Sequence, residues 1–176
     1  MSKYIFTSQR LGFRTWEYSD IEFLNGLNSN QDVMRFFPRF PSEEDNLAFI
    51  KKMRNQYDEK EYCYFLVEEL ASRKAIGFIG LSYQDYNSDF TPATDIGWRI
   101  MPEFWGRGYA SEGALKCLEY AKNEIQLATI ISVAPKINQP SISVMRKIGL
   151  QKIKEFKHPL LNDTPNLELC VLYETV

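Results

Sequence analysis

The segment Asp95-Ile-Gly-Trp-Arg-Ile-Met-Pro-Glu-Phe-Trp-Gly-Arg-Gly-Tyr-Ala-Ser-Glu-Gly113 decides the fold of this chain. It begins with a strand-like run, which we place at residues 95–101 and which stops at Pro102. A turn with two glycines follows. Residues 110–123 then show helical spacing, with Ala114 and Cys117 on the inner side. The segment therefore predicts a strand, a turn and a helix in direct succession.

The turn itself has the pattern Gly106-x-Gly108-x-Ala110. Glycine allows positive φ and a close approach of the backbone to a ligand. The amides of residues 107–111 would then point outward at a helix N-terminus, where partial positive charge favours an anion such as pyrophosphate. Arg107 adds a full charge. The turn therefore predicts a phosphate site, although a plain strand-to-helix connection with nothing bound has the same pattern.

Two better-known phosphate motifs do not fit this turn. A Walker loop requires G-x-x-x-x-G-K-[ST], which the chain lacks. A Rossmann fingerprint opens the first βαβ unit of its domain, whereas this turn comes after three predicted strands in a row. We therefore expect neither a P-loop fold nor a dinucleotide-binding fold.

Hydrophobic periodicity and turn residues predict the elements on either side of this segment. Ser19-Asp20 is a typical helix start, as is Ser42 with Asp45 three residues later. Gly149 suits the left-handed end of the last helix. Strands are expected at residues 9–16, 62–69, 75–83, 128–134, 150–156 and 167–173, and helices at residues 19–28, 42–58 and 141–148. The order β-α-α-β-β-β-α-β-α-β-β predicts one mixed α/β domain over residues 1–176.

Composition and charge narrow the class of protein. Of the 176 residues, 44% are hydrophobic and 14% aromatic, enough to bury a sizeable core without disulfides or metal. Lys and Arg total 21 against 23 Asp and Glu, which gives a net charge of −2. Domains that bind nucleic acid usually carry a basic face or stripe. We therefore expect no nucleic-acid partner.

Cysteine and histidine usage favours a reducing compartment and argues against a metal site. Cys63, Cys117 and Cys170 are odd in number and lack C-x-x-C spacing, which favours free buried thiols in the cytosol. His158 is the single histidine, so no His/Cys metal cluster is expected. The first residues lack the apolar core of a signal peptide, and no run of about 18 apolar residues could span a membrane. We therefore expect a soluble, cytoplasmic protein.

Several stretches together resemble the GNAT superfamily of N-acetyltransferases, and within it the RimJ/RimL-like branch of ribosomal-protein-alanine acetyltransferases. The resemblance covers nearly the whole chain, and it is specific because the stretches keep their order and spacing. They are Arg10-Leu-Gly-Phe-Arg-Thr-Trp16, Asp32-Val-Met-Arg-Phe-Phe-Pro38, Ile76-Gly-Phe-Ile-Gly-Leu81, residues 96–112 of the segment quoted above, Asn138-x-x-Ser141 with Met145-x-x-Ile-Gly-Leu150, and Phe156-x-His158-Pro159.

The resemblance implies a twisted, mixed and mostly antiparallel sheet flanked by helices, whose fourth and fifth strands splay apart and hold acetyl-CoA. The family motif Q/R-x-x-G-x-G/A begins with Gln or Arg, but Trp105 stands there in this chain. Backbone amides and Arg107 would therefore hold the phosphates. By this resemblance, the residues expected to bind acetyl-CoA are Trp98, Arg99, Ile100, Arg107, Gly108, Tyr109, Ala110, Ser111 and Asn138.

The resemblance also implies catalytic candidates. A backbone amide near residues 98–100 would meet the thioester oxygen. Many relatives carry a tyrosine for the leaving thiolate where this chain has Met145, and Ser141 is the substitute used in the RimJ/RimL branch. A purely structural role for Ser141 as a helix cap stays open. Asp95 is a candidate base at the start of its strand, and a solvated carboxylate would look the same. His158 has a suitable intrinsic pKa, although a structural role before Pro159 is the alternative.

The expected acceptor is an amine, either a protein N-terminus or a small molecule such as an amino acid, a polyamine or an antibiotic. Residues 34–38 and the loop 85–92 would rim its pocket, where Arg35 could meet an acidic group. A non-catalytic acyl-CoA-binding module on the same fold is the alternative function, because the family tyrosine is missing and no base is obvious. A homodimer is left open.

Overall fold

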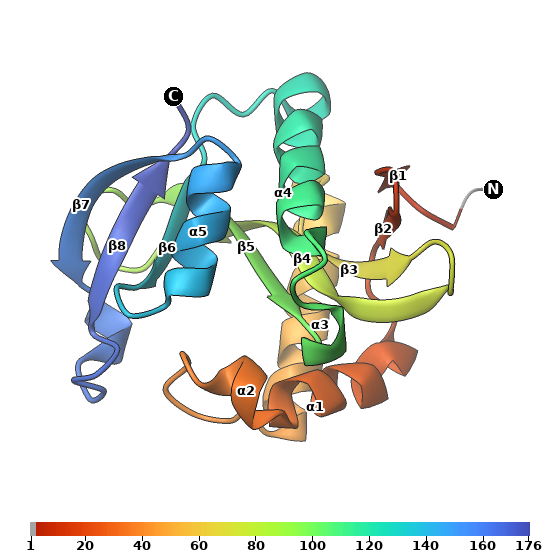
Figure 1. The fold of residues 1–176 in the computed structure, drawn as a ribbon, viewed down its shortest axis with the longest axis horizontal. Helices are drawn as coiled ribbons and strands as arrows, with labels where there is room; N and C mark the ends of the chain where they lie inside the picture. The colour runs from red at the N-terminus through yellow and green to blue at the C-terminus, as the bar shows by residue number, and fades with distance from the viewer. Residues whose placement is uncertain (1–2) are drawn as a thin grey trace.

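The structure, a computed structural model, describes residues 3–176, in which strands and helices alternate along the chain (Figure 1). The strands are β1 (Phe6–Thr7), β2 (Leu11–Arg14), β3 (Tyr64–Glu69), β4 (Lys74–Gln84), β5 (Ala93–Ile100), β6 (Ile131–Pro135), β7 (Gln151–Lys157) and β8 (Leu169–Glu174). The α-helices are α1 (Ile21–Ser29), α2 (Gln31–Met34), α3 (Glu43–Lys60), α4 (Tyr109–Tyr120) and α5 (Gln139–Lys147).

Within the described residues, the strands form one sheet in the order β1-β2-β3-β4-β5-β6-β8-β7. Neighbouring strands are antiparallel except β5 and β6, which are parallel. β5 pairs with β4 along its whole length, whereas β5 and β6 share the single pair Asp95↔Ile131. The two strands therefore diverge after one point of contact (Figure 1). This confirms the mixed α/β fold and the splay between the fourth and fifth predicted strands, which are β5 and β6.

Helices cover both faces of the sheet (Figure 1). On one face Gly113 of α4 lies directly against Ile79 of β4. The preceding residue of β4, Phe78, contacts Phe49 of α3 on the other face, with ring centroids 5.2 Å apart. Because successive side chains of a strand point to opposite faces, β4 and β5 take part in both layers. A site on β5 can therefore draw on helices from either side.

Local signals in the sequence determine several helix ends. The Ser42 hydroxyl accepts a hydrogen bond from Asp45 N at 3.1 Å, and the Asp45 carboxylate accepts one from Ser42 N at 2.8 Å. This capping box satisfies two backbone donors and confirms the helix start predicted there. Gly149 follows α5 with a φ of 87°, which confirms the left-handed helix end.

One predicted helix start is wrong, and the correction affects a candidate site residue. The helix predicted at residues 141–148 begins at Gln139 as α5. Its N-cap is Asn138, whose side-chain oxygen accepts a hydrogen bond from Ser141 N at 3.2 Å. Asparagine caps a helix as well as serine does. Ser141 is consequently the third residue of α5 and not its cap.

Short elements and irregular ends differ most from the sequence-based expectation. β1 and α2 were not predicted, because elements of two to four residues show no clear period. The strand predicted at residues 128–134 begins only at Ile131, and the strand predicted at 9–16 covers only Leu11–Arg14. The helix predicted at residues 110–123 is α4 followed by a π-helical turn, Ala121–Ile125. The predicted order of elements is otherwise correct.

The cysteines behave as their spacing predicts. Cys63, Cys117 and Cys170 are all free and buried. Among residues 3–176, no helix has the length and apolar character needed to cross a membrane. In that same part of the chain, no three His, Cys, Asp or Glu side chains gather where they could hold a metal ion.

Candidate active site

The space between β5 and β6, which we call the wedge, contains a cavity of about 240 Å³. At its apex the two strands are joined by the Ser132 hydroxyl, which donates to the Ile96 carbonyl at 2.9 Å. Beyond this point no strand of residues 3–176 pairs with the edge of β5 that faces β6. Asp95, Gly97 and Arg99 of β5 line the cavity. The wedge therefore exposes both backbone and side chains of β5.

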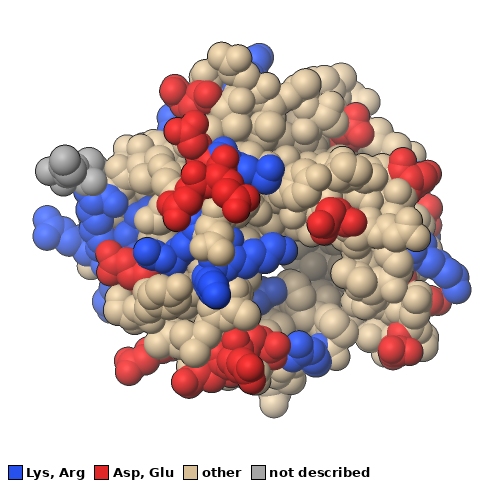
Figure 2. Space-filling view, turned by 180° about the vertical axis from the view of Figure 1, so that it is seen from behind, with Lys and Arg blue, Asp and Glu red and all other residues tan. Residues whose placement is uncertain are grey.

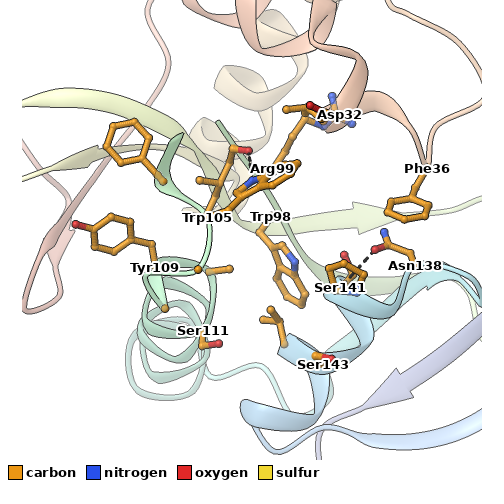
Figure 3. A pocket seen from close by; sticks show the side chains of 18 of the residues that line it. Asp32, Phe36, Trp98, Arg99, Trp105, Tyr109, Ser111, Asn138, Ser141 and Ser143 are labelled. Atoms are coloured by element: carbon orange, nitrogen blue, oxygen red, sulfur yellow. Dashed lines mark hydrogen bonds between the residues drawn. The ribbon is translucent and has the colours of Figure 1, made fainter. Parts of the chain in front are cut away.

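A second cavity, of about 360 Å³, adjoins the first between α4 and α5 (Figure 3). Trp98 points into the space between these helices, with Ser111 of α4 on one side and Ser143 of α5 on the other. Arg107 is exposed and lines neither cavity. The other residues expected to bind acetyl-CoA all line the larger cavity, namely Trp98, Arg99, Ile100, Gly108, Tyr109, Ala110, Ser111 and Asn138.

The first turn of α4 forms part of the larger cavity wall. Gly106 and Gly108 have φ of 72° and 79°, a region that glycine reaches without strain. Gly108 is the N-cap of α4 and has no side chain to satisfy the free amides. The N–H groups of Tyr109, Ala110 and Ser111 therefore have no partner inside the helix. Their partial positive charge makes this wall suitable for an anion.

Further residues in or beside the larger cavity were not identified from the sequence. The Arg10 guanidinium lies next to Gly108, brought there because β2 and α4 are neighbours in the fold. Pro140, Ser143 and Lys147 line the larger cavity from one face of α5. Their i, i+3, i+7 spacing is a helical signal that could have revealed this face. Arg10 could not have been found in that way, because nothing in its local sequence points to α4.

The backbone of β5 faces the wedge at Trp98. The Ile96 carbonyl accepts from Ser132 of β6, and the Ile100 carbonyl accepts from the indole Nε1 of Trp105 at 2.7 Å. Both carbonyls therefore face away from β4. Since the N–H and C=O of alternate residues point to the same side of a strand, those of Trp98 share this direction. The wedge therefore presents a backbone donor where the sequence led us to expect one.

Asp95 lies in the smaller cavity and is held by two donors. The Tyr64 hydroxyl donates a short hydrogen bond to Asp95 Oδ1, and Gln84 Nε2 donates to the same oxygen at 3.2 Å. Burial raises the pKa of Asp95 to about 6, although these donors and the charge of Lys52 oppose the rise. Burial also raises the pKa of Tyr64 well above its usual value, so the phenol remains the donor. The carboxyl group thus titrates in the range useful to a general base.

Ser141 lines both cavities. Its backbone amide donates to Asn138 Oδ1, and none of the side-chain hydrogen bonds within residues 3–176 involves its hydroxyl. The capping role considered for Ser141 is wrong, because Asn138 occupies the cap. The hydroxyl is therefore available to a ligand. Asn138 also lines both cavities, while its side-chain oxygen is engaged in the cap.

His158 lies away from both cavities. Its Nδ1 accepts from Leu160 N at 3.2 Å, and its ring lies 4.6 Å from that of Tyr86. Burial lowers the pKa of His158. The loop 85–92, expected at the acceptor pocket, lines neither cavity and packs toward β7 through Phe90 and Phe156, 4.9 Å apart. The structure thus gathers Asp95 and Ser141 at the wedge but not His158.

The other expected acceptor wall does lie at the cavities. Arg35, Phe36 and Phe37 follow α2 and line the larger cavity, and the two phenylalanines line the smaller one as well. The Arg35 guanidinium stacks 4.6 Å from the Phe36 ring centroid. Tyr64, which we did not single out from the sequence, completes the wall beside Asp95.

Solved structures with this fold include acetyltransferases. The crystal structure of an acetyltransferase (GNAT family) from Bacillus anthracis superimposes with a TM-score of 0.78 at 28% identity and covers 97% of this chain and 96% of that one. The ribosomal-protein-S5-alanine acetyltransferase from Vibrio fischeri has a TM-score of 0.77 at 18% identity, with 97% and 95% covered. The second likeness shows a common fold alone.

Sequence comparisons lead to the same family. The uncharacterized N-acetyltransferase YnaD of Bacillus subtilis is 34% identical over 152 residues, which are 86% of this chain and 85% of the relative. The spermidine N(1)-acetyltransferase of Escherichia coli is 24% identical over 151 residues, 82% of this chain and 75% of the relative. The family described as the acetyltransferase (GNAT) domain matches residues 10–151. The chain therefore belongs to the GNAT acetyltransferases, and it is an acyltransferase enzyme.

Proposed function

We propose that this enzyme transfers an acetyl group from acetyl-CoA to a primary amine, directly and with both substrates bound. One observation carries the proposal: adjoining cavities lead from the open start of α4, past the backbone of Trp98, to the half-buried carboxyl group of Asp95. The amides at one end could bind phosphates, and the carboxylate at the other end could accept the proton of an amine. The family match supports the same reaction.

The residues around the larger cavity fit acetyl-CoA. The free amides that follow Gly108 would hold its pyrophosphate, and Lys147 would add positive charge nearby. Arg10 also lies near, but its charge is paired with Glu112 at 2.7 Å. Acetyl-CoA supplies a thioester whose carbonyl carbon an amine can attack. The N–H of Trp98 would donate to the thioester oxygen, where negative charge develops. Much of the rate acceleration would come from holding the two reactants together in the wedge.

Two side chains would handle protons. Asp95 would accept the proton of the attacking amine, directly or through water, because its carboxylate is available near neutral pH. The Tyr64 hydroxyl would hold this carboxylate in place. On the other side, the free hydroxyl of Ser141 would donate a hydrogen bond to the departing sulfur. The roles of Asp95 and Ser141 are thus separate, one for each substrate.

The acceptor is proposed here only as a primary amine. The relative from Escherichia coli is named for spermidine, and the structure from Vibrio fischeri for a ribosomal protein. Identities of 24% and 18% do not carry either acceptor over to this chain. We also propose one N-acetyltransferase domain over residues 1–176, acting in the cytoplasm. The continuous sheet and the three free buried thiols support this.

The test is an acetyl-CoA assay with a panel of amines that includes free amino acids, polyamines and peptides with free N-termini. Release of CoA together with an acetylated product is expected. Acetyl-CoA alone should also stabilise the protein, by about 2.7 kcal/mol when present at about 100 times its Kd. A non-catalytic acyl-CoA-binding module would show this stabilisation without CoA release. A melting curve unmoved by millimolar acetyl-CoA would sink the proposal altogether.

A further inference from the structure

Arg99, in the middle of the site, is a half-buried cation, and its Nε atom is fully buried. Its Nη1 donates to Asn28 Oδ1 at 2.5 Å, while its Nε is buried and has no hydrogen-bond partner. The guanidinium carbon lies 3.9 Å from the ring centroid of Phe37 and 5.2 Å from that of Phe78. No carboxylate within the described residues forms an ion pair with it. Aromatic rings therefore flank this charge, and no carboxylate in that part of the chain neutralises it.

Another enclosed arginine of this protein, Arg14, does have counterions. Arg14 forms ion pairs with Asp20 at 2.7 Å and with Glu68 at 2.8 Å. A buried charge without a partner is unfavourable, because the desolvation of the ion is not offset. The two ion pairs of Arg14 are typical of an arginine with a structural role. The unpaired state of Arg99 points instead to a partner that comes from outside the chain.

The free edge of Arg99 has the shape of a carboxylate site. Asn28 occupies Nη1, and within residues 3–176 neither Nε nor Nη2 has a hydrogen-bond acceptor. These two N–H groups are parallel and match the two oxygens of a carboxylate. Burial lowers the pKa of Arg99 to about 10, so it stays protonated at neutral pH. Because Arg99 lines both cavities, a bound substrate can reach it.

Arg99 and Asp95 lie on the same face of β5, with Gly97 between them. Their Cα atoms are about 13 Å apart if the strand rises about 3.3 Å per residue. Tyr64 packs over Gly97 and bonds to Asp95. On the side turned away in Figure 1, the molecular surface is hollowed, and Lys or Arg side chains border the hollow (Figure 2). An acceptor in the smaller cavity could present its amine near Asp95 and an anionic group near Arg99.

We propose that the acceptor carries a carboxylate as well as its amine, and that the Nε–Nη2 edge of Arg99 binds this carboxylate. The inference rests on the proposed acetyl transfer, since it names the class of amine accepted at the same site. A polyamine brings only positive charge to Arg99 and is therefore a poor acceptor. The number of bonds between amine and carboxylate is set by the distance from Asp95 to Arg99.

The test uses matched pairs of acceptors. Glycine, β-alanine, 4-aminobutanoate, 6-aminohexanoate and α-amino acids with longer side chains are each compared with their carboxamides, and spermidine is added. We expect kcat/KM for the best acid to exceed that of its amide about 10²-fold. Arg99→Met should bring this ratio close to one. Arg99→Lys, which keeps the charge but loses the fork, should retain part of the preference.

Arg54→Met is the matched control. Arg54 is also half-buried, donates to one carbonyl oxygen, that of Trp16, and stacks 5.2 Å from the Tyr18 ring, but it lines neither cavity. Its removal should leave the acid-to-amide ratio intact. The inference is overturned if kcat/KM of the wild-type enzyme for amides or spermidine equals that for acids. It is also overturned if Arg99→Met lowers kcat/KM for acids and for amides by the same factor.

A binding measurement separates the two proposals. Each acid and amide is added to protein saturated with CoA, and the melting temperature is recorded. If no amine is acetylated but acids still stabilise wild type and not Arg99→Met, the carboxylate site stands and the acetyl-transfer proposal fails. If neither acetylation nor acid-specific stabilisation occurs, the carboxylate site is rejected as well. Weaker CoA binding by Arg99→Met, with unchanged acid preference, would assign Arg99 to the cofactor instead.

Discussion

Two regions of one sheet handle buried charge in opposite ways. At β2 and β3, Arg14 is enclosed together with Asp20 and Glu68, and each charge has a partner. At the wedge, Asp95 and Arg99 are also enclosed, yet neither forms an ion pair with another side chain of residues 3–176. The first region lies where strands pair continuously, the second where β5 and β6 diverge.

The difference indicates what each region does. Paired buried charges limit the desolvation cost and hold neighbouring elements in register, so they serve the fold. Unpaired buried charges in a cavity have shifted pKa values and free hydrogen-bonding edges, which is typical of functional sites. Substitutions at β2 and β3 should therefore lower stability and spare the chemistry. Substitutions at the wedge should impair the chemistry and leave stability nearly unchanged.

The largest effect is expected from Arg14→Met. This change leaves Asp20 and Glu68 enclosed without their main counterion. Breaking a buried pair in this way costs about 3–5 kcal/mol. Urea denaturation should show that loss, while kcat at a temperature where the variant is folded stays near the wild-type value. Arg39→Met is the control, because its ion pair with Asp45 is exposed and should matter little. Equal losses in both variants would contradict the comparison.

Asp95→Asn should instead damage the chemistry. Removal of a general base lowers kcat by about 10²-fold or more. In wild type, kcat/KM should rise with pH and level off above about 6, since Asp95 must be ionised to accept a proton. The variant should lack this limb of the profile. A wild-type pH profile retained by Asp95→Asn would assign the base to another group.

Stability gives an independent test of the same substitution. The pKa of Asp95 is raised by folding, from an ordinary 3.8 to about 6, so ionisation is harder in the folded protein. Wild-type stability should therefore fall as pH rises from about 4 to about 6, and the deficit should persist above that, at up to about 3 kcal/mol. Asparagine removes the ionisation. At pH 8 the inactive variant should be at least as stable as wild type in urea denaturation.

Gly108→Val tests the larger cavity at the start of α4. Valine at a φ of 79° is strained and would crowd the free amides of the α4 start. We expect a roughly 10- to 100-fold loss of CoA affinity in a calorimetric titration, as charge-assisted hydrogen bonds are weakened. Gly149→Val is the matched control, because Gly149 has a φ of 87° and lines neither cavity. Both variants should lose similar stability, about 1–3 kcal/mol, but only Gly108→Val should show a lower affinity for CoA.

The glycine turn and helix start that we propose as the phosphate site could be recognised early because they are contiguous in the sequence. Strand, glycine turn and helix follow one another within residues 95–113, and the chemistry of glycine indicates positive φ at Gly106 and Gly108. The contacts between side chains of different strands could not be predicted from the sequence in the same way. Tyr64 and Gln84 meet Asp95 across 31 and 11 residues of chain. No local pattern shows that these side chains converge.

Side-chain direction limited the prediction in a second way. Residues 98–100 were expected to act through their backbone, and nothing in the sequence showed that Arg99 is enclosed by Phe37 and Phe78 without a counterion. His158 had the intrinsic pKa of a base, but the contacts of its ring with Tyr86 keep it from the wedge. Burial and partners come from tertiary packing, and they decide which titratable residue is functional.

The smallest effect is expected from Ser141→Ala. If the Ser141 hydroxyl donates to the departing sulfur, its interaction strengthens only as charge develops, so kcat should fall while the Kd for CoA changes little. A thiolate is already a fair leaving group, and we expect a loss of about tenfold, the low end of general-acid effects. Stability should be nearly unchanged, because Asn138 and not Ser141 caps α5.

Two neighbours on α5 provide the controls for this last variant. Asn138→Ala removes the cap and should cost about 1 kcal/mol of stability, which gives the size of a purely structural effect on the same helix turn. Ser143→Ala removes a hydroxyl that lines only the larger cavity, and its kcat should stay near wild type. If Ser141→Ala lowers the melting temperature as Asn138→Ala does but turns over normally, Ser141 supports the helix and the wedge performs acetyl transfer without it. A tenfold slower enzyme that melts like wild type would place Ser141 with Asp95 among residues that serve the chemistry and not the fold.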